Sequence, residues 1–436
     1  MIPDTLRLEP GGTLCGRLRV PGDKSISHRA VMFGALADGV TEVRDCLMGE
    51  DVRATIAAFR AMGVAIEELD QGRLLRIQGR GRDGLITPST VLDCGNSGTS
   101  MRLLSGIVAG AGLKAILTGD DSLRRRPMRR VTDPLEQMGA RITTQANGNP
   151  PIKLAAGAAL HAIDYALPVA SAQVKSAILL AGLFATGTTK VTEPAPTRDH
   201  TERMLTGFGV RVERVGNQIS VDGGQRLTAA PIVVPADISS AAFFLVGAAL
   251  AAATEVVMEA VGINPTRTGV LDILRLMGAD IRVRNTREIG GEPVADLHVR
   301  ASALHGIEVP RTLVPLAIDE FPVLFVAAAC AKGLTRVTGA EELRHKESDR
   351  IETMATGLRA MGAQVTTLPD GMEIIGGPLG GATIEAHGDH RIAMSFAIAS
   401  LRATQPLTIH GWATIATSFP TFVDLARAAG MRIHPA

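Results

Sequence analysis

The chain has 436 residues, more than the roughly 250–300 at which a single hydrophobic core usually stops growing, so two domains are expected. Hydrophobic residues make up 46% and charged residues 20%, which excludes a disordered chain. The formal charge of +1 and the 3% of aromatic residues argue against a nucleic-acid partner and against a basic membrane-binding protein.

The first 19 residues carry acids, Gly and Pro where a signal peptide has a basic start and an apolar stretch, so a cytoplasmic protein is expected. The longest apolar run, Ala241 to Ala253, has 13 residues, fewer than the roughly 18 needed to cross a bilayer. That run predicts a buried helix and no membrane partner. Nothing in the sequence marks an obligate interface, so we expect a monomer.

The cysteine and histidine spacing gives no metal motif. Four cysteines lie far apart without a CxxC pair, which predicts reduced and mostly buried thiols. His387 and His390 resemble a ligand pair, but no third ligand is near and Arg391 would repel a cation. We therefore expect no metal.

Two short phrases recur along the chain with the same period. The first is a helix end, a glycine and a strand, and the second is a Ser, Asp or Asn cluster that opens an Ala-rich helix. Their intervals are 68–84 and 68–80 residues, so six units of about 72 residues fill the chain. The glycines are Gly63, Gly139, Gly209, Gly278, Gly362 and Gly430, and the helix starts lie near Ser25, Ser97, Ser171, Ser239, Asp319 and Asp389.

Each unit alternates helices with strands, which predicts an α/β fold. Strands are expected at Val40–Val43, Thr188–Thr192 and Leu334–Thr338, and each recurring glycine suits the left-handed position that ends a helix. The helices that begin at Ser171 and Ser239 are apolar on nearly every face, so we expect helices at the centre and sheets around them. Six units divide into three and three, with a hinge close to Asp237.

Several helix starts carry cations that an ordinary helix cap does not need. Helix N-termini attract anions through their N–H groups, and added Lys or Arg strengthens that attraction. If the units are pseudo-symmetric, these starts converge on one cleft between the two halves and bind small polyanions. The cationic segments are 24–29, 124–130, Lys175, 196–200, 341–350 and 387–391.

Plainer interpretations stay open for single motifs. The arginines of 124–130 could bind nucleic acid, but they stand alone in a neutral chain. Neither 79–84 nor 22–25 keeps the spacing and context of a nucleotide-binding loop. Asp319 and Glu320 could serve only the helix dipole, or one of them could be a base in a cationic cleft.

The sequence closely resembles the 5-enolpyruvylshikimate-3-phosphate (EPSP) synthase family, with features of its class II branch. The matching segments touch all six units. They are PGDKSISHR (21–29), LDCGNSGTSMRLLSG (92–106), RRPM (125–128), LPVASAQVKSAILLAGL (167–183), PTRDHTE (196–202), NPTRTG (264–269), IDEFP (318–322), ELRHKESDRI (342–351), GDHRIAMSF (388–396) and ATSFP (416–420).

The resemblance implies the enolpyruvyltransferase fold, a two-domain inside-out α/β barrel of six βαβαββ-type repeats. Domain I would comprise 1–21 plus 238–436, and domain II 22–237, with three repeats each. It implies transfer of the enolpyruvyl group of phosphoenolpyruvate to the 5-hydroxyl of shikimate 3-phosphate, with release of phosphate and without metal or organic cofactor.

The same resemblance assigns residues to the two substrates. Shikimate 3-phosphate would be bound by Lys24, Ser25, Arg29, Ser171, Ala172, Gln173, Arg198, Asp319 and Lys346. Phosphoenolpyruvate would be bound by Lys24, Gly98, Arg126, Gln173, Arg350 and Arg391, since guanidinium groups suit its phosphate and carboxylate. Asp319, Glu347 and Lys24 would be catalytic, with Asp319 as the base at the 5-hydroxyl.

Two alternatives and two departures accompany this assignment. A UDP-N-acetylglucosamine enolpyruvyltransferase shares the fold, but it uses a loop cysteine that residues 107–135 lack. A non-catalytic anion-binding protein on the same scaffold would not need Asp319 and Glu347.

Leu103 and Thr417 differ from the best-known branch of the family. Gly98 remains a glycine, so we expect at least partial sensitivity to the inhibitor glyphosate.

Overall fold

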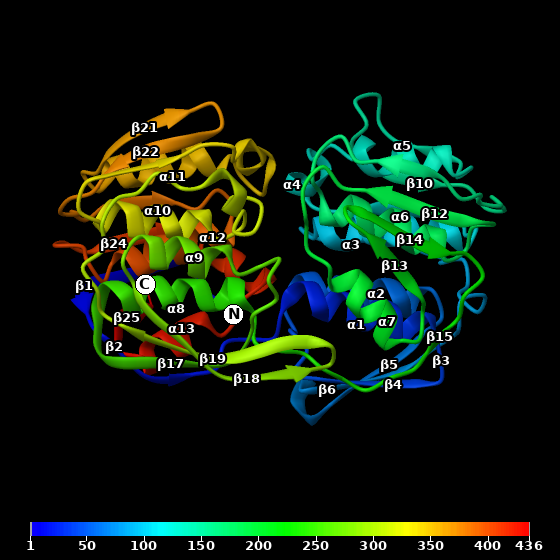
Figure 1. The fold of residues 1–436 in the computed structure, drawn as a ribbon, viewed down its shortest axis with the longest axis horizontal. Coiled ribbons are helices and arrows are strands. Elements are labelled where there is room, and N and C mark those ends of the chain that lie inside the picture. Colours follow the sequence, from blue (N-terminus) through cyan, green and yellow to red (C-terminus); the bar gives the residue numbers. More distant parts are fainter. Residues whose placement is uncertain (1, 436) are drawn as a thin grey trace. The chain divides into compact units, whose positions relative to one another are not determined.

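The computed structural model describes residues 2–435, which form two compact units (Figure 1). Unit 1 comprises the chain up to Asp23, Pro235–Glu288 and the chain from Glu292 onward. Unit 2 comprises Lys24–Val234 and Ile289–Gly291. Nearly all of unit 2 therefore comes from one continuous segment, and unit 1 is assembled from segments far apart in sequence.

Unit 2 surrounds three central helices with sheets. Its helices are α1 (Lys24–Leu36), α2 (Glu50–Ala61), α3 (Gly98–Gly110), α4 (Asp121–Arg124), α5 (Arg129–Gln137), α6 (Ala172–Gly182) and α7 (His200–Gly207). Its strands are β3 (Ala37–Asp38), β4 (Val40–Arg44), β5 (Ala65–Leu69), β6 (Leu74–Gln78), β7 (Leu92–Asp93), β8 (Ala115–Thr118), β9 (Ile142–Thr143), β10 (Ile152–Leu154), β11 (Asp164–Ala166), β12 (Thr188–Thr192), β13 (Val212–Val215), β14 (Gln218–Asp222), β15 (Leu227–Thr228) and β16 (Ile232–Val233). The four-stranded sheets run β16-β4-β6-β5, β7-β8-β10-β9 and β11-β12-β14-β13.

Unit 1 repeats this plan. Its helices are α8 (Ile238–Ala251), α9 (Gly269–Leu276), α10 (Phe321–Cys330), α11 (Arg350–Ala360), α12 (His390–Ala399) and α13 (Phe422–Ala428). Its strands are β1 (Thr5–Gly12), β2 (Leu14–Leu18), β17 (Ala252–Gly262), β18 (Asp280–Ile289), β19 (Glu292–Arg300), β20 (Leu334–Val337), β21 (Gln364–Leu368), β22 (Gly371–Ile375), β23 (Thr383–Glu385), β24 (Leu407–His410) and β25 (Met431–Pro435). The sheets run β23-β24-β1-β25, β18-β19-β17-β2 and β20-β22-β21.

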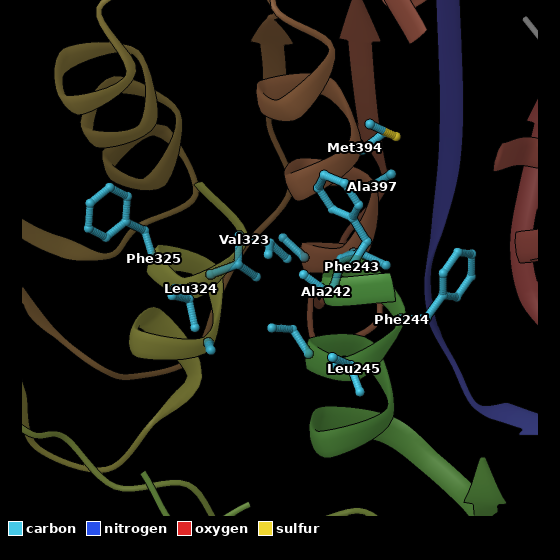
Figure 2. Packing of buried hydrophobic residues seen from close by; sticks show 14 of the residues in the cluster. Ala242, Phe243, Phe244, Leu245, Val323, Leu324, Phe325, Met394 and Ala397 are labelled. Carbon is cyan, nitrogen blue, oxygen red and sulfur yellow. The ribbon is translucent and has the colours of Figure 1, made fainter. Parts of the chain in front are cut away.

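The central helices are buried on nearly every face, as the sequence predicted. Residues 238–249 of α8 are all buried, and α10 and α12 pack against that helix. Figure 2 shows Phe243 of α8, Val323 of α10 and Ala397 of α12 gathered in the core of unit 1. Small residues allow this close helix packing, which accounts for the abundance of Ala and Gly.

The repeat prediction is confirmed at its glycines. The six recurring glycines all have φ between 83° and 108°, and each follows the last turn of a helix. Only glycine adopts this left-handed conformation without steric cost, which explains why it recurs in all six sequence repeats. The three predicted strands are confirmed as β4, β12 and β20, with ends that differ by at most one residue.

The helices predicted near Ser239 and Asp319 begin within two residues of those positions. The helix assigned to Ser239 begins at Ile238, because Asp237 provides the cap by accepting the Ser239 backbone N–H (2.9 Å). The helix assigned to Asp319 begins at Phe321, with Pro322 in its first turn. The four cysteines are free, as predicted, and Cys15 is the exposed one. Cys46 and Cys94 are buried, and burial raises the pKa of Cys46 to about 12.

Candidate active site

In unit 2, side-chain hydrogen bonds join the starts of α3 and α6. Gln173, in the first turn of α6, donates through Nε2 to Thr99 Oγ1 (2.9 Å), and its Oε1 accepts from Arg102 Nη1 (2.5 Å). Each helix begins with a serine cap, Ser97 or Ser171, whose hydroxyl accepts a backbone N–H of the first turn. Gln173 is therefore fixed against the neighbouring helix.

Lys24 is the first residue of α1, and its ammonium group pairs with Asp51 in the first turn of α2. The Asp51 side chain is only 6% exposed, whereas that of Lys24 is 20% exposed. Lys24 is therefore partly exposed to solvent, and the buried carboxylate of Asp51 holds its ammonium group in place.

Arg29 lies one turn further into α1 and is almost completely buried. Its Nε donates to Thr201 Oγ1 (2.7 Å), its Nη2 to Ser176 Oγ (2.9 Å) and its Nη1 to the Ser25 carbonyl (2.9 Å). These bonds hold the guanidinium against α6 and α7.

Of the arginines in 124–130, only Arg126 is buried. Its Nη2 donates to Asn96 Oδ1 (3.0 Å) and to Ser122 Oγ (3.3 Å), next to the start of α3. Gly98, the first residue of α3, is so close that an added Cβ would lie 3.3 Å from Arg126 Nη1 and 2.8 Å from Arg102 Nη1. The glycine makes room for the two guanidinium groups.

Three further predicted residues lie at the edges of these helices. Ser171 and Ala172 form the start of α6, and Arg198 precedes α7; all three are partly buried.

Lys175 does not belong with them, so its assignment to the cationic cleft was wrong. Its side chain is fully buried, and its Nζ lies 2.6 Å from Glu202 and 3.1 Å from Glu193 in an internal ion triad.

In unit 1, two cations converge on Asp319. Its Oδ1 lies 3.3 Å from Arg350 Nη1 and 3.4 Å from Lys346 Nζ. Glu347 accepts a hydrogen bond from Arg350 Nη2 (2.6 Å), and Lys346 also pairs with Glu342 (2.7 Å). The structure thus brings both predicted catalytic carboxylates of this unit onto one guanidinium.

A buried carboxylate orients that guanidinium. Asp389 is fully buried and accepts from Arg350 Nε (2.8 Å) and Nη2 (3.3 Å). Burial lowers the pKa of Arg350, but Asp389 and Glu347 raise it by more, so it lies above its ordinary value. Asp389 also accepts the backbone N–H of Arg391 (2.9 Å). This bond caps α12 and places the Arg391 backbone beside the Asp389 carboxylate.

A second buried guanidinium in unit 1 was not predicted to take part in a site. Arg267 is 4% exposed and lies 3.6 Å from Asp23 and 3.7 Å from Asp237. Burial and the neighbouring Asp23 raise the pKa of Asp237 to about 7, although Arg267 and Arg391 act in the opposite direction. This carboxyl group therefore takes up a proton near neutral pH.

Asp237→Asn should weaken the pH dependence of stability. A carboxyl group whose pKa is raised from about 3.9 to about 7 by folding contributes stability below pH 3.9 that is lost as the pH rises through 7. Asparagine also caps helices and does not titrate. Urea denaturation at pH 5 and pH 8 should show that the wild type loses roughly 1–3 kcal/mol more than the variant. Equal losses in both proteins would contradict this prediction.

Reasoning from the sequence missed the partners that hold the predicted residues. Asp51, Arg102 and Glu320 each contact a predicted site residue, yet none of them was predicted to hold another side chain in place. Asp51 shows one signal, since it is an acidic residue in the first turn of a helix.

No helix within residues 2–435 is long and apolar enough to cross a membrane. The same residues contain no group of three or more His, Cys, Asp or Glu side chains that could hold a metal ion.

The fold is shared with enolpyruvyl transferases. The crystal structure of the enolpyruvyl transferase NikO from Streptomyces tendae is 18% identical, with a TM-score of 0.79 over 99% of each chain. The structure of EPSP synthase from Acinetobacter baumannii is 55% identical, with a TM-score of 0.88 over 99% of each chain. The predicted α/β fold class is therefore confirmed.

The sequence comparisons agree over the whole chain. The family model of EPSP synthase (3-phosphoshikimate 1-carboxyvinyltransferase) matches residues 8–425. The 3-phosphoshikimate 1-carboxyvinyltransferase of Methylococcus capsulatus is 62% identical over 98% of this chain and 97% of its own. That of Alkalilimnicola ehrlichii is 61% identical over 98% and 96%. The chain belongs to the EPSP synthase family of enzymes, as its motifs predicted.

Proposed function

We propose that this enzyme transfers the enolpyruvyl group of phosphoenolpyruvate to the 5-hydroxyl of shikimate 3-phosphate and releases phosphate, a step toward chorismate and the aromatic amino acids. One observation carries the proposal: relatives that are 57–62% identical over 98% of the chain bear the name of this activity. The names favour it over a UDP-N-acetylglucosamine enolpyruvyltransferase and over a non-catalytic binding protein.

The reaction needs acid and base chemistry at one centre. The 5-hydroxyl oxygen bonds to C2 of phosphoenolpyruvate and loses its proton, while the methylene carbon gains a proton, which gives a tetrahedral adduct. The adduct then eliminates phosphate and a methyl proton, and the enol ether remains. We assign the hydroxyl proton to Asp319, the methylene proton to Glu347 and stabilisation of the phosphate charge to Lys24.

The contacts within each unit support this division of roles. Asp319 and Glu347 both contact Arg350, so two proton-transfer groups are held on one rigid support. Lys24 is held by Asp51 and remains partly exposed. A catalytic group must be fixed close to its target for efficient proton transfer.

Residues of both units are proposed to bind the two substrates. For shikimate 3-phosphate they are Lys24, Ser25, Arg29, Ser171, Ala172, Gln173, Arg198, Asp319 and Lys346. For phosphoenolpyruvate they are Lys24, Gly98, Arg126, Gln173, Arg350 and Arg391. The support for the second set is chemical, because guanidinium groups bind phosphate and carboxylate in a bidentate manner.

The remaining predictions about the molecule are part of the same proposal. We propose a cytoplasmic monomer that needs no metal or organic cofactor and binds neither nucleic acid nor membrane. Its two domains would be 1–21 plus 238–436 and 22–237. Light scattering of the purified protein tests the monomer, and limited proteolysis tests the boundaries.

The decisive experiment follows phosphate release. Purified protein, dialysed against a chelator, is mixed with shikimate 3-phosphate and phosphoenolpyruvate, and phosphate is measured over time. Release that requires both substrates supports the proposal. No release above background, with the protein folded by circular dichroism, would overturn it, and replacement of shikimate 3-phosphate by UDP-N-acetylglucosamine tests the alternative.

Gly98→Ala should weaken inhibition by glyphosate and raise the phosphoenolpyruvate KM. The new methyl group would lie 2.8 Å from Arg102 Nη1, so this guanidinium and that of Arg126 must shift. Displacing a charge-assisted contact costs about 1–3 kcal/mol, or roughly 5- to 150-fold in binding. Glyphosate inhibition curves for both proteins provide the measurement. A wild type that resists glyphosate far above its phosphoenolpyruvate KM, or a variant with unchanged inhibition, would contradict the prediction.

A further inference from the structure

Glu320 is a buried carboxylate at the start of α10, directly after Asp319. Its Oε1 accepts a hydrogen bond from Ser239 Oγ in the first turn of α8. The same oxygen lies 3.5 Å from Arg267 Nη2 and 4.0 Å from Arg391 Nη1 in the first turn of α12. One side chain that is 1% exposed therefore contacts residues from the starts of the other two central helices of unit 1.

Arg267 is also buried and lies against this carboxylate. Its Nη2 donates to Ser239 Oγ, the group that donates to Glu320. The turn that carries Arg267 is fixed by Asn264, whose Oδ1 accepts the Thr266 N–H (2.9 Å). Asn264 and Arg267 belong to the NPTRTG segment, which was matched to the family without a role, and the structure connects that segment to Glu320.

The Arg391 guanidinium lies near this carboxylate. Within residues 2–435, Glu320 is the carboxylate that lies within 4.0 Å of the Arg391 guanidinium. Asp389 fixes only the backbone of Arg391, through its N–H. Bidentate recognition of an anion requires a guanidinium whose orientation is fixed. The buried carboxylate of Glu320 lies 4.0 Å from Arg391 Nη1, beyond hydrogen-bond distance, and acts on that guanidinium through its charge.

We propose that Glu320, held by Ser239 and Arg267, is a positioning residue that orients Arg391 for an anionic group of phosphoenolpyruvate. The inference rests on the proposed function and adds to it a residue that does not touch substrate. Glu320 acts through Arg391, and its negative charge also compensates the buried charge of Arg267.

The test compares Glu320→Gln with the wild type. Glutamine preserves the volume and an acceptor oxygen but removes the charge that restrains Arg391. Since ordering a side chain on binding costs about 0.5–1.5 kcal/mol, the phosphoenolpyruvate KM should rise about 2- to 13-fold. The shikimate 3-phosphate KM should change less than about twofold, a split that general destabilisation would not produce.

Asp296→Asn is the matched control. Asp296 is another buried carboxylate of unit 1, and it accepts hydrogen bonds from the Ala260 N–H (2.9 Å) and from Asn285 Nδ2 (2.8 Å), away from Glu320. Its neutralisation should lower the melting temperature without changing the phosphoenolpyruvate KM. If this control raises that KM as much as Glu320→Gln does, the effect is structural and the inference fails.

A double-mutant cycle gives a second readout. In an Arg391→Lys background, Glu320→Gln should add little further loss of phosphoenolpyruvate affinity, measured by titration in the presence of shikimate 3-phosphate. Full additivity of the two changes would overturn the inference.

The remaining outcomes are also decisive. If Glu320→Gln does not fold, Ser239→Ala takes its place, because it removes the hydroxyl that donates to Glu320, and an unchanged phosphoenolpyruvate KM then overturns the inference. An inactive wild type refutes the proposed function and this inference together. An active wild type with a folded Glu320→Gln of unchanged phosphoenolpyruvate KM refutes the inference alone.

Discussion

Asp319→Asn is expected to lower turnover by about 10²- to 10⁴-fold, the usual contribution of a general base. The substitution keeps the size of the side chain and removes its ability to accept the hydroxyl proton. Asp319 lies beside Lys346, which is proposed to bind shikimate 3-phosphate and keeps its positive charge in the variant. Steady-state phosphate release should therefore show a large fall in kcat, while the affinity for shikimate 3-phosphate stays within a few-fold of wild type.

Asp272→Asn is the control for this experiment. Asp272 lies on α9 of the same unit, is 46% exposed and pairs only weakly with Arg275 at 3.8 Å. Its removal should leave kcat within about twofold of wild type, since exposed pairs contribute little. A near-normal kcat for Asp319→Asn would mean that Asp319 is structural, and Glu347 would then become the first candidate for the base.

Asp389→Ala is expected to destabilise the protein by about 3–5 kcal/mol, because it leaves the buried Arg350 without the carboxylate that binds its Nε and Nη2. Loss of the α12 cap contributes about 1 kcal/mol more. Against a typical total of about 5–15 kcal/mol, this is a large fraction of the stability. Urea denaturation followed by circular dichroism measures the change.

Asp349→Ala separates the cap from the buried charge. Asp349 caps α11 by accepting the N–H groups of Ile351 and Glu352, but its ion pair with Arg344 is partly exposed. This variant should lose only about 1 kcal/mol. If both variants lose the same amount, the buried pair of Asp389 and Arg350 contributes little beyond a helix cap.

The repeated architecture was predictable because its signals are local. A glycine with positive φ ends a helix in each of the six sequence repeats, and this requirement is met at all six positions. Ser97, Ser171 and Asp389 mark helix starts for a similar reason, since their side chains accept the first N–H groups. Each of these features depends on a few adjacent residues.

The errors concern choices that tertiary structure makes. Asp237 and Ser239 are both suitable caps, and the sequence does not decide between them; Asp237 caps the helix, while Ser239 bonds to Glu320. Lys175 resembles the other cations at helix starts, but it is buried because Glu193 and Glu202 come from separate elements to pair with it. The partners of a charge are distant in sequence, so spacing alone does not reveal them.

The discontinuous construction of unit 1 has a consequence for synthesis on the ribosome. Strand β1 pairs with β24 and β25, which follow it by about 400 residues, whereas nearly all of unit 2 comes from one continuous segment. At about 5–20 residues per second, β1 waits roughly 20–80 s for its neighbours, and unit 2 is complete well before them. The nascent chain therefore carries an unpaired strand edge through most of translation, which is a period when a chaperone can protect it.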